Sequence, residues 1–231
     1  MKRILIVSAH PDDDILGCGA YLYKYRNELE FRVVFIAEGS TCRFDFDRIQ
    51  SKEALEQIEI RTASAIKSLN VLGVKNFKFY DLPCGRLDQI PIIDINKIIE
   101  NEIRTFKPDT IMVHSETDVN NDHRIVARSL EMAARPVWQD CDVNIVSFEV
   151  LSTTEWNLSG PFTPNLFEEI SEECLRKKWE ALECYYTEIK EFPYPRSYVG
   201  LETLAKYRGM QSGFKFAESF KIIRWKNRIT V

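Results

Sequence analysis

Residues 4–14 read Ile-Leu-Ile-Val-Ser-Ala-His-Pro-Asp-Asp-Asp. The short apolar run at 4–8 is typical of a strand buried on both faces of a parallel sheet. His10 and three aspartates follow this strand directly. Because the carboxyl ends of parallel strands line the ligand crevice of an open α/β sheet, we expect these polar side chains to lie in a functional site.

The same rhythm of strand and helix continues through the first two thirds of the chain. Further strands are expected at 31–37, 77–80, 110–113 and 143–150, and helices at 14–28, 49–69, 92–105 and 122–134. Proline closes two of these helices, at Pro108 and Pro136. Strands that alternate with helices in this way predict a doubly wound α/β fold with a mainly parallel sheet.

The last third of the chain has a looser pattern. We expect an ordered loop at 152–168, helices at 171–187 and 198–210, and extended or mixed structure at 214–225. No internal repeat or low-complexity linker divides the chain, so residues 1–231 are predicted to form a single domain. The final segments would form a helical and loop extension over the site.

Composition and charge exclude several classes of function. Apolar residues make up 45% of the chain, charged residues 29%, and the net charge is −4. No basic stripe is present for nucleic acid or an anionic membrane. No apolar stretch reaches the roughly 18–20 residues that a transmembrane helix needs, and no secretory signal is visible, so a cytoplasmic location is expected. The six cysteines are expected to be reduced, buried thiols.

Three histidines and neighbouring carboxylates suggest a metal site. His10, His114 and His123 all fall just after expected strands or at helix starts. A catalytic zinc ion takes three protein ligands and leaves one position open. We expect His10, Asp13 and His123 to supply these ligands, although Fe²⁺ or Co²⁺ would also suit them. Asp12, beside the metal but not on it, is then the candidate general base for an activated water.

The two motifs resemble those of the PIG-L/LmbE-like deacetylases, whose usual forms are A-H-P-D-D-E and H-P-D-H. The resemblance rests on residues 9–14 and 120–124 and continues through 133–136, 147–156, 162–165 and 206–209. It implies a Rossmann-like fold and zinc-dependent hydrolysis of an N-acetyl group on a glucosamine-like substrate. The partner would be a small N-acylated sugar or sugar conjugate. It also implies His10, Asp13 and His123 as zinc ligands and Asp12 as the general base.

Two positions depart from the family pattern. Asp14 replaces the usual glutamate, which keeps the charge but shortens its reach. Asn120 replaces the first histidine of the second motif. In the family that histidine is thought to stabilise the oxyanion or protonate the leaving amine. Asn120 can donate a neutral hydrogen bond but cannot act as an acid, so we expect His114, oriented by Asp118, to take over the role.

Other readings are weaker or stay open. Asn120 is the one feature that supports an alternative, a non-catalytic metal-binding or sugar-binding protein with a degraded site. Gly17-Cys18-Gly19 lacks the third glycine of a dinucleotide fingerprint. Arg43 and Arg48 are either contacts for an anionic substrate or solvated surface. Glu155, Trp156, Asn165 and Arg196 would line a pocket formed by the last third, although Trp156 is equally compatible with the core. The acyl group, the sugar and the oligomeric state are not predicted.

Overall fold

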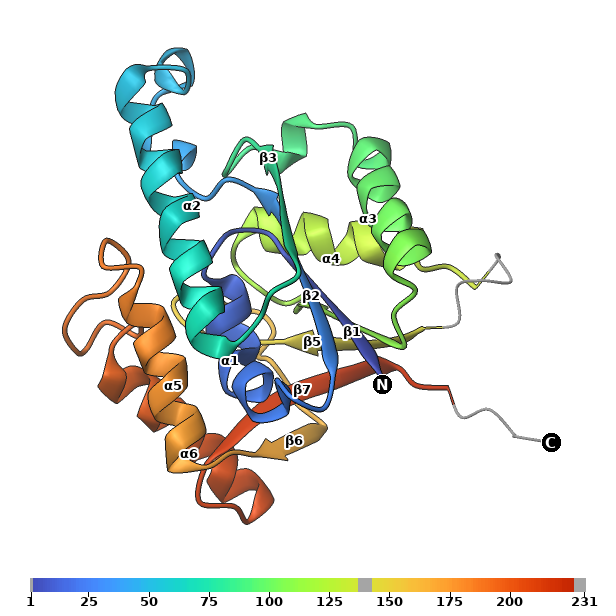
Figure 1. The fold of residues 1–231 in the computed structure, drawn as a ribbon, viewed down its shortest axis with the longest axis vertical. Coiled ribbons are helices and arrows are strands. Elements are labelled where there is room, and N and C mark those ends of the chain that lie inside the picture. Colours follow the sequence, from blue (N-terminus) through green and yellow to red (C-terminus); the bar gives the residue numbers. More distant parts are fainter. Residues whose placement is uncertain (1, 137–142, 227–231) are drawn as a thin grey trace.

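The protein is built around one mainly parallel sheet. The computed structural model describes residues 2–136 and 143–226, and within them the strand order is β3-β2-β1-β4-β5-β7-β6 (Figure 1). The strands are β1 Arg3–Ser8, β2 Glu30–Ala37, β3 Phe77–Leu82, β4 Thr110–His114, β5 Asn144–Phe148, β6 Leu166–Glu169 and β7 Ala217–Arg224. The first five in sequence run parallel, whereas β7 is antiparallel to both β5 and β6. The predicted α/β fold is confirmed.

Helices cover both faces of the sheet. They are α1 Asp13–Tyr25, α2 Lys52–Leu72, α3 Ile92–Phe106, α4 Asn121–Ala133, α5 Glu172–Glu183 and α6 Tyr198–Ser212. Side chains alternate along β1, so that Ile4 and Ile6 join one buried core and Leu5 and Val7 join the other. The first core packs against α1, α2, α5 and α6, and the second against α3 and α4 (Figure 1).

Helix α1 is interrupted, and the interruption ties the C-terminal extension to the rest of the molecule. Cys18 has non-helical dihedral angles (φ −144°, ψ 23°). Glu218 of β7 accepts hydrogen bonds from the backbone N–H groups of Ala20 (3.0 Å) and Tyr21 (2.7 Å). Lys178 of α5 donates to the carbonyl of Leu16 (2.8 Å) and to Glu218 (2.7 Å). Backbone groups freed by the kink therefore find charged partners.

The expected elements are observed with shifted ends, and one expectation was wrong. The segment 152–168 was predicted to be a loop, but its end contributes to β6, where Leu166 pairs with Phe220 and Phe167 with Ser219. The strand exists because β7, more than fifty residues later in the chain, supplies its hydrogen-bond partners, and a local pattern does not reveal such a partner. The segment 214–225, predicted to be extended or mixed, contains β7.

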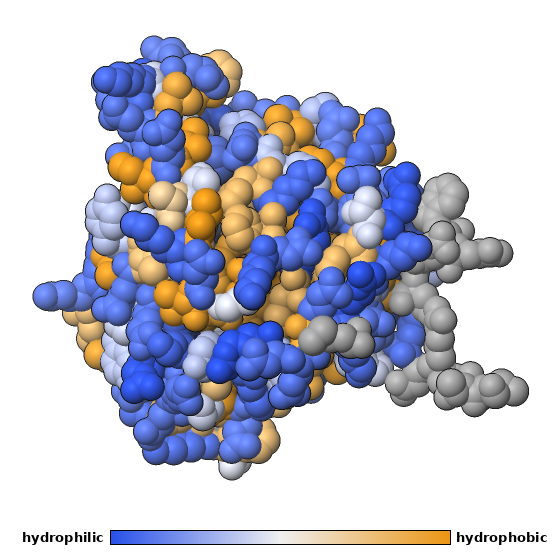
Figure 2. Space-filling model, in the orientation of Figure 1, coloured by the Kyte–Doolittle hydropathy of each residue, from blue (hydrophilic) through white to orange (hydrophobic). Residues whose placement is uncertain are grey.

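The visible face of the molecule is dominated by hydrophilic side chains, with hydrophobic ones gathered toward its middle (Figure 2). Among the described residues, no helix combines the length and the apolar character that crossing a membrane requires. The described cysteines carry free thiols, and Cys42 is exposed while Cys18, Cys84 and Cys174 are buried. Cys141 lies outside the described residues.

Candidate metal and catalytic site

The candidate site lies where the winding of the sheet reverses. Successive crossovers lead from β1 outward to β2 and β3, and then from β4 outward to β5. The carboxyl ends of β1 and β4 are therefore adjacent at a topological switch point, where open α/β sheets bind ligands. The turn after β1 carries His10 to Asp14, and β4 leads through Asp118 into α4, which carries His123 near its start.

A strained turn after β1 sets the directions in which Asp12 and Asp13 point. Asp12 has a positive φ of 112°, which is costly for a residue with a Cβ atom. The turn is held by Asp13, whose Oδ2 accepts a 2.7 Å hydrogen bond from the backbone N–H of His10. As a result, Asp12 and Asp13 are neighbours in sequence but face different partners.

His10, Asp13 and His123 converge as a group that could hold a metal ion. One ligand atom from each lies within 4.8 Å of the others, and all three side chains are buried. His10 Nδ1 is 3.3 Å from Asp13 Oδ2, and His123 Nε2 is 3.3 Å from Asp13 Oδ1. Among the described residues, neither Nε2 nor Nδ1 of His123 has a hydrogen-bond partner. Two imidazoles and a carboxylate with an unsatisfied buried nitrogen fit a three-ligand catalytic metal site.

Two further aspartates lie against the second ring nitrogens of these histidines. Asp122 Oδ2 is 2.9 Å from His10 Nε2, and Asp118 Oδ2 is 3.1 Å from His123 Nδ1. Carboxylates that hold the second ring nitrogen of a histidine ligand fix its tautomer and orientation. Burial opposes protonation of His10, but hydrogen bonds to Asp122 and Asp13 prevail and raise its pKa to about 10. Sequence reasoning assigned Asp118 to His114, whereas the structure places it against His123.

Two arginines hold the predicted general base. Asp12 Oδ2 accepts hydrogen bonds from Arg61 Nη2 (3.0 Å) and Arg196 Nη1 (2.6 Å), while its Oδ1 has no hydrogen-bond partner among the described residues. Burial raises the pKa of Asp12, and the charges of Arg196 and Arg61 partly oppose that rise. Glu188 pairs with both arginines. One carboxylate oxygen of Asp12 therefore remains available.

His114 is buried beneath the metal ligands. Its Nε2 accepts a hydrogen bond from the backbone N–H of Ala9 (2.8 Å), and its ring stacks on His123 with 3.9 Å between centroids. Burial, together with the charge of His123, lowers the pKa of His114 to about 3. A neutral ring with an occupied Nε2 is poorly suited to donating a proton. These features argue against His114 as the acid, and its other predicted role, stabilisation of the oxyanion, stays a prediction.

Asn120 and Asp14, the two residues that depart from the family motifs, lie in different environments. Asn120 is the N-cap of α4, where its side-chain oxygen accepts from the backbone N–H of Asp122 (2.9 Å). Asp14 is fully buried, and neither of its carboxylate oxygens has a hydrogen-bond partner among the described residues. Burial and the nearby Asp12 and Asp13 raise the pKa of Asp14 to about 8.

Sequence reasoning missed Arg61, Asp122 as a partner of His10, and Glu188. Arg61 left a readable signal, because it lies on the same side of α2 as the buried Ala54, Ala65 and Leu72. A charged residue within an apolar stripe indicates a buried partner.

Of the other residues that the sequence analysis suggested for substrate contacts, one reaches the site and the others lie elsewhere. Arg196 reaches the site, whereas Arg43 pairs with Glu188 and Arg48 lies near Glu53 at the surface. Asn165 bonds to the backbone of β7, Glu155 accepts from the backbone N–H of Ser152, and Trp156 is half exposed.

Comparison with known proteins identifies the family. A family model described as PIG-L, GlcNAc-PI de-N-acetylase, matches residues 5–134, more than half of the chain. The chain belongs to the PIG-L family. The matched range contains every metal-ligand candidate together with Asp12, His114 and Asn120, whereas Arg196 lies outside it.

Individual relatives of this PIG-L chain are distant. A diacetylchitobiose deacetylase from Thermococcus kodakarensis is 23% identical, covering 96% of this chain and 84% of the relative. The structure of N,N'-diacetylchitobiose deacetylase from Pyrococcus horikoshii has a TM-score of 0.76 at 19% identity, over 96% of this chain and 84% of that one. The 4-carboxy-2-hydroxymuconate hydratase from Pseudomonas putida has a TM-score of 0.72 at 18% identity, over the full length of both chains. A deacetylase and a hydratase share this fold, so the reaction must be argued from the site.

Proposed function

We propose that this PIG-L protein is a zinc-dependent hydrolase that removes an acyl group, most simply acetyl, from the nitrogen of an amino sugar or sugar conjugate. The observation that carries the proposal is the convergence of His10, Asp13 and His123 beside Asp12 at the sheet's switch point. The comparisons support the choice of an acylated amino sugar, because two distant relatives are named for deacetylating diacetylchitobiose.

The residues divide the work between holding the metal and moving a proton. His10, Asp13 and His123 would hold the ion, which when bound lowers the pKa of water and polarises a carbonyl. Asp12 would accept a proton from the attacking water through Oδ1, because Oδ2 is occupied by Arg61 and Arg196. The same carboxyl group would then return the proton to the departing nitrogen. Water and amide thus become a carboxylate and a free amine.

Asn120 would stabilise the negative charge that develops on the carbonyl oxygen. Its side-chain oxygen caps α4, which leaves the amide N–H₂ group as a donor for the developing oxyanion. A neutral amide stabilises negative charge but delivers no proton. We therefore assign both proton transfers to Asp12 and none to His114.

The decisive experiment follows amine release from a panel of N-acetylated amino sugars. Metal-free protein should be inactive, zinc should restore turnover, and Asp12→Asn should bind zinc normally yet lose at least about 10²-fold in kcat. Asp13→Ala should lose both metal and activity. Fe²⁺ and Co²⁺ are tested in the same assay, since the ligand set also suits them.

The alternative function is a metal-binding or sugar-binding protein without catalysis, and Asn120 is the feature that favours it. That function predicts stoichiometric zinc binding and saturable sugar binding, with no amine released from any member of the panel. Asn120→His would separate the two cases, because an enzyme with a working Asp12 keeps turnover with either residue, whereas a degraded site gains turnover only with the histidine.

A further inference from the structure

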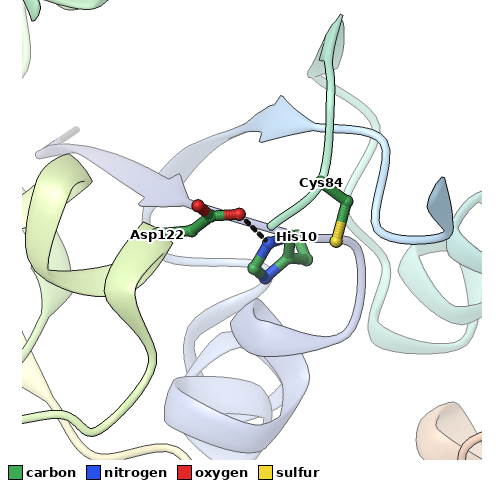
Figure 3. A group of neighbouring side chains, drawn as sticks. All are labelled: His10, Cys84 and Asp122. Carbon is green, nitrogen blue, oxygen red and sulfur yellow. Dashed lines mark hydrogen bonds and ion pairs between the residues drawn. The ribbon is translucent and has the colours of Figure 1, made fainter. Parts of the chain in front are cut away.

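A second group of metal-binding side chains shares His10 with the proposed catalytic set. Cys84 follows β3, and one ligand atom each from Cys84, His10 and Asp122 lies within 4.8 Å of the others (Figure 3). All three residues are buried. Neither the family motifs nor the proposed reaction gives Cys84 a task.

The two ring nitrogens of His10 serve different sets. Nδ1 faces Asp13, at 3.3 Å from Oδ2, whereas Nε2 faces Asp122, at 2.9 Å from Oδ2. Asp122 therefore lies at the edge of the imidazole opposite the proposed catalytic ion, and Cys84 lies within reach of both Asp122 and His10. Thiolate, imidazole and carboxylate together are a ligand set for zinc, and thiolate favours softer ions over Mg²⁺ or Ca²⁺.

The loop that carries Cys84 is held firmly in place. Asp122 accepts hydrogen bonds from the backbone N–H groups of Gly85 (2.6 Å) and Leu87 (3.2 Å), and the backbone N–H of Cys84 donates to Glu38 (2.8 Å). Ligand atoms around a tetrahedral zinc ion lie roughly 3.3–3.7 Å apart. The His10–Asp122 contact would have to open by only a few tenths of an ångström.

A second thiol lies next to the group. Cys42 is exposed, and its side chain lies against the turn at Gly85, next to Cys84. The two segments lie very close together, because a Cβ atom added at Gly85 would lie 2.8 Å from Cys42 Cβ. The buried group therefore has a soft, solvent-facing neighbour through which an ion can enter.

We propose that Cys84, Asp122 and Nε2 of His10 form a second site for a soft divalent cation such as zinc, and that occupation of this site inhibits the enzyme. The inhibitory part rests on the proposed function, in which Nδ1 of His10 binds the catalytic ion. A cation at Nε2 replaces the proton shared with Asp122, and the Cys84 thiol releases its proton to solvent. Both sites need the ring of His10, and two divalent cations held on one ring repel each other, so the two sites oppose each other.

The binding test uses Co²⁺, whose thiolate complexes show a sulfur-to-cobalt charge-transfer band in the near ultraviolet. Metal-free wild type, Cys84→Ser and Cys174→Ser are titrated with Co²⁺. In wild type the band should grow once more than one equivalent of Co²⁺ has been added. Cys174→Ser is the matched control, because it removes a buried thiol of α5 outside the proposed site, and it should show the same band. Cys84→Ser should bind the first equivalent without the band. A band that persists in Cys84→Ser, or none in wild type at excess Co²⁺, overturns the second site.

The activity test follows amine release at rising zinc concentration. Wild type should be inhibited by excess zinc, whereas Cys84→Ser should keep its basal turnover and need roughly tenfold or more zinc for the same inhibition. Equal inhibition of both proteins overturns the inhibitory role. The cobalt band requires no turnover, so a Cys84-dependent band in a protein that cleaves no amide supports the second site while the deacetylase proposal fails.

Discussion

Asp118 is expected to govern metal affinity from outside the proposed ligand set. It lies 3.1 Å from His123 Nδ1 and also accepts hydrogen bonds from Thr153 (2.9 Å) and Thr154 (2.6 Å). We expect Asp118→Asn to weaken zinc binding by about 10–100-fold, because the neutral amide no longer fixes the histidine tautomer. Competition with a chelator measures this change. Thr153→Val is the control and should bind zinc as wild type does; an unchanged affinity in Asp118→Asn would refute the role.

Arg196 influences the pKa of Asp12, the proposed general base. The charge of Arg196 lowers the pKa of Asp12 against the rise caused by burial. Removing that charge in Arg196→Ala should raise the pKa of Asp12 further. Because the base works as a carboxylate, the acidic limb of the kcat/KM profile should move to higher pH. Arg43→Ala is the control and should leave the acidic limb in place, because the partner of Arg43 is Glu188 and not Asp12. Superimposable acidic limbs for Arg196→Ala and wild type would contradict this account.

At the scale of elements, the close packing of α1 against the sheet depends on Gly17. A Cβ atom at this position would lie 2.7 Å from Cγ of Phe148 at the end of β5. Both partners are buried, so we expect Gly17→Ala to lower the free energy of unfolding by about 1–3 kcal/mol. Urea denaturation measures the change. Gly160→Ala, where the nearest atom is 3.8 Å away on Thr117, should stay within about 0.5 kcal/mol of wild type. Equal effects of the two substitutions would exclude the steric explanation.

At the scale of the whole molecule, a buried ion pair joins the C-terminal extension to α1. Lys178 and Glu218 are 2.7 Å apart and nearly inaccessible to solvent. Lys178→Met leaves a buried carboxylate unpaired and should cost about 3–5 kcal/mol of unfolding free energy. Lys178→Met combined with Glu218→Gln should cost less, because no buried charge remains unpaired.

The control for this pair is Lys215→Met, which removes an exposed partner of Glu172. It should change the urea midpoint little, because exposed ion pairs are well solvated. If the double variant were as unstable as Lys178→Met, the loss would come from packing and not from the unpaired charge.

Much of the fold and part of the site were readable in the sequence. The apolar run at 4–8 and its repeats predicted the parallel sheet, because buried strands and amphipathic helices have different periods. The histidine and aspartates after the first strand predicted a site, because parallel strands share one carboxyl edge. The three predicted ligands, His10, Asp13 and His123, lie close together in the structure, and their role in binding a metal stays a prediction.

Other features depended on contacts between distant parts of the chain. Strand β6 exists through its pairing with β7, and Arg196 reaches Asp12 across 184 residues. Asp118 faces His123, and Cys84 lies beside His10, only because separate crossovers end at the same rim. The sequence by itself determined where the parallel strands and the helices lie and which polar groups end them, but not where β6 lies. The tertiary structure alone decided which of those groups meet, because partner choice depends on packing across the sheet and no local periodicity records it.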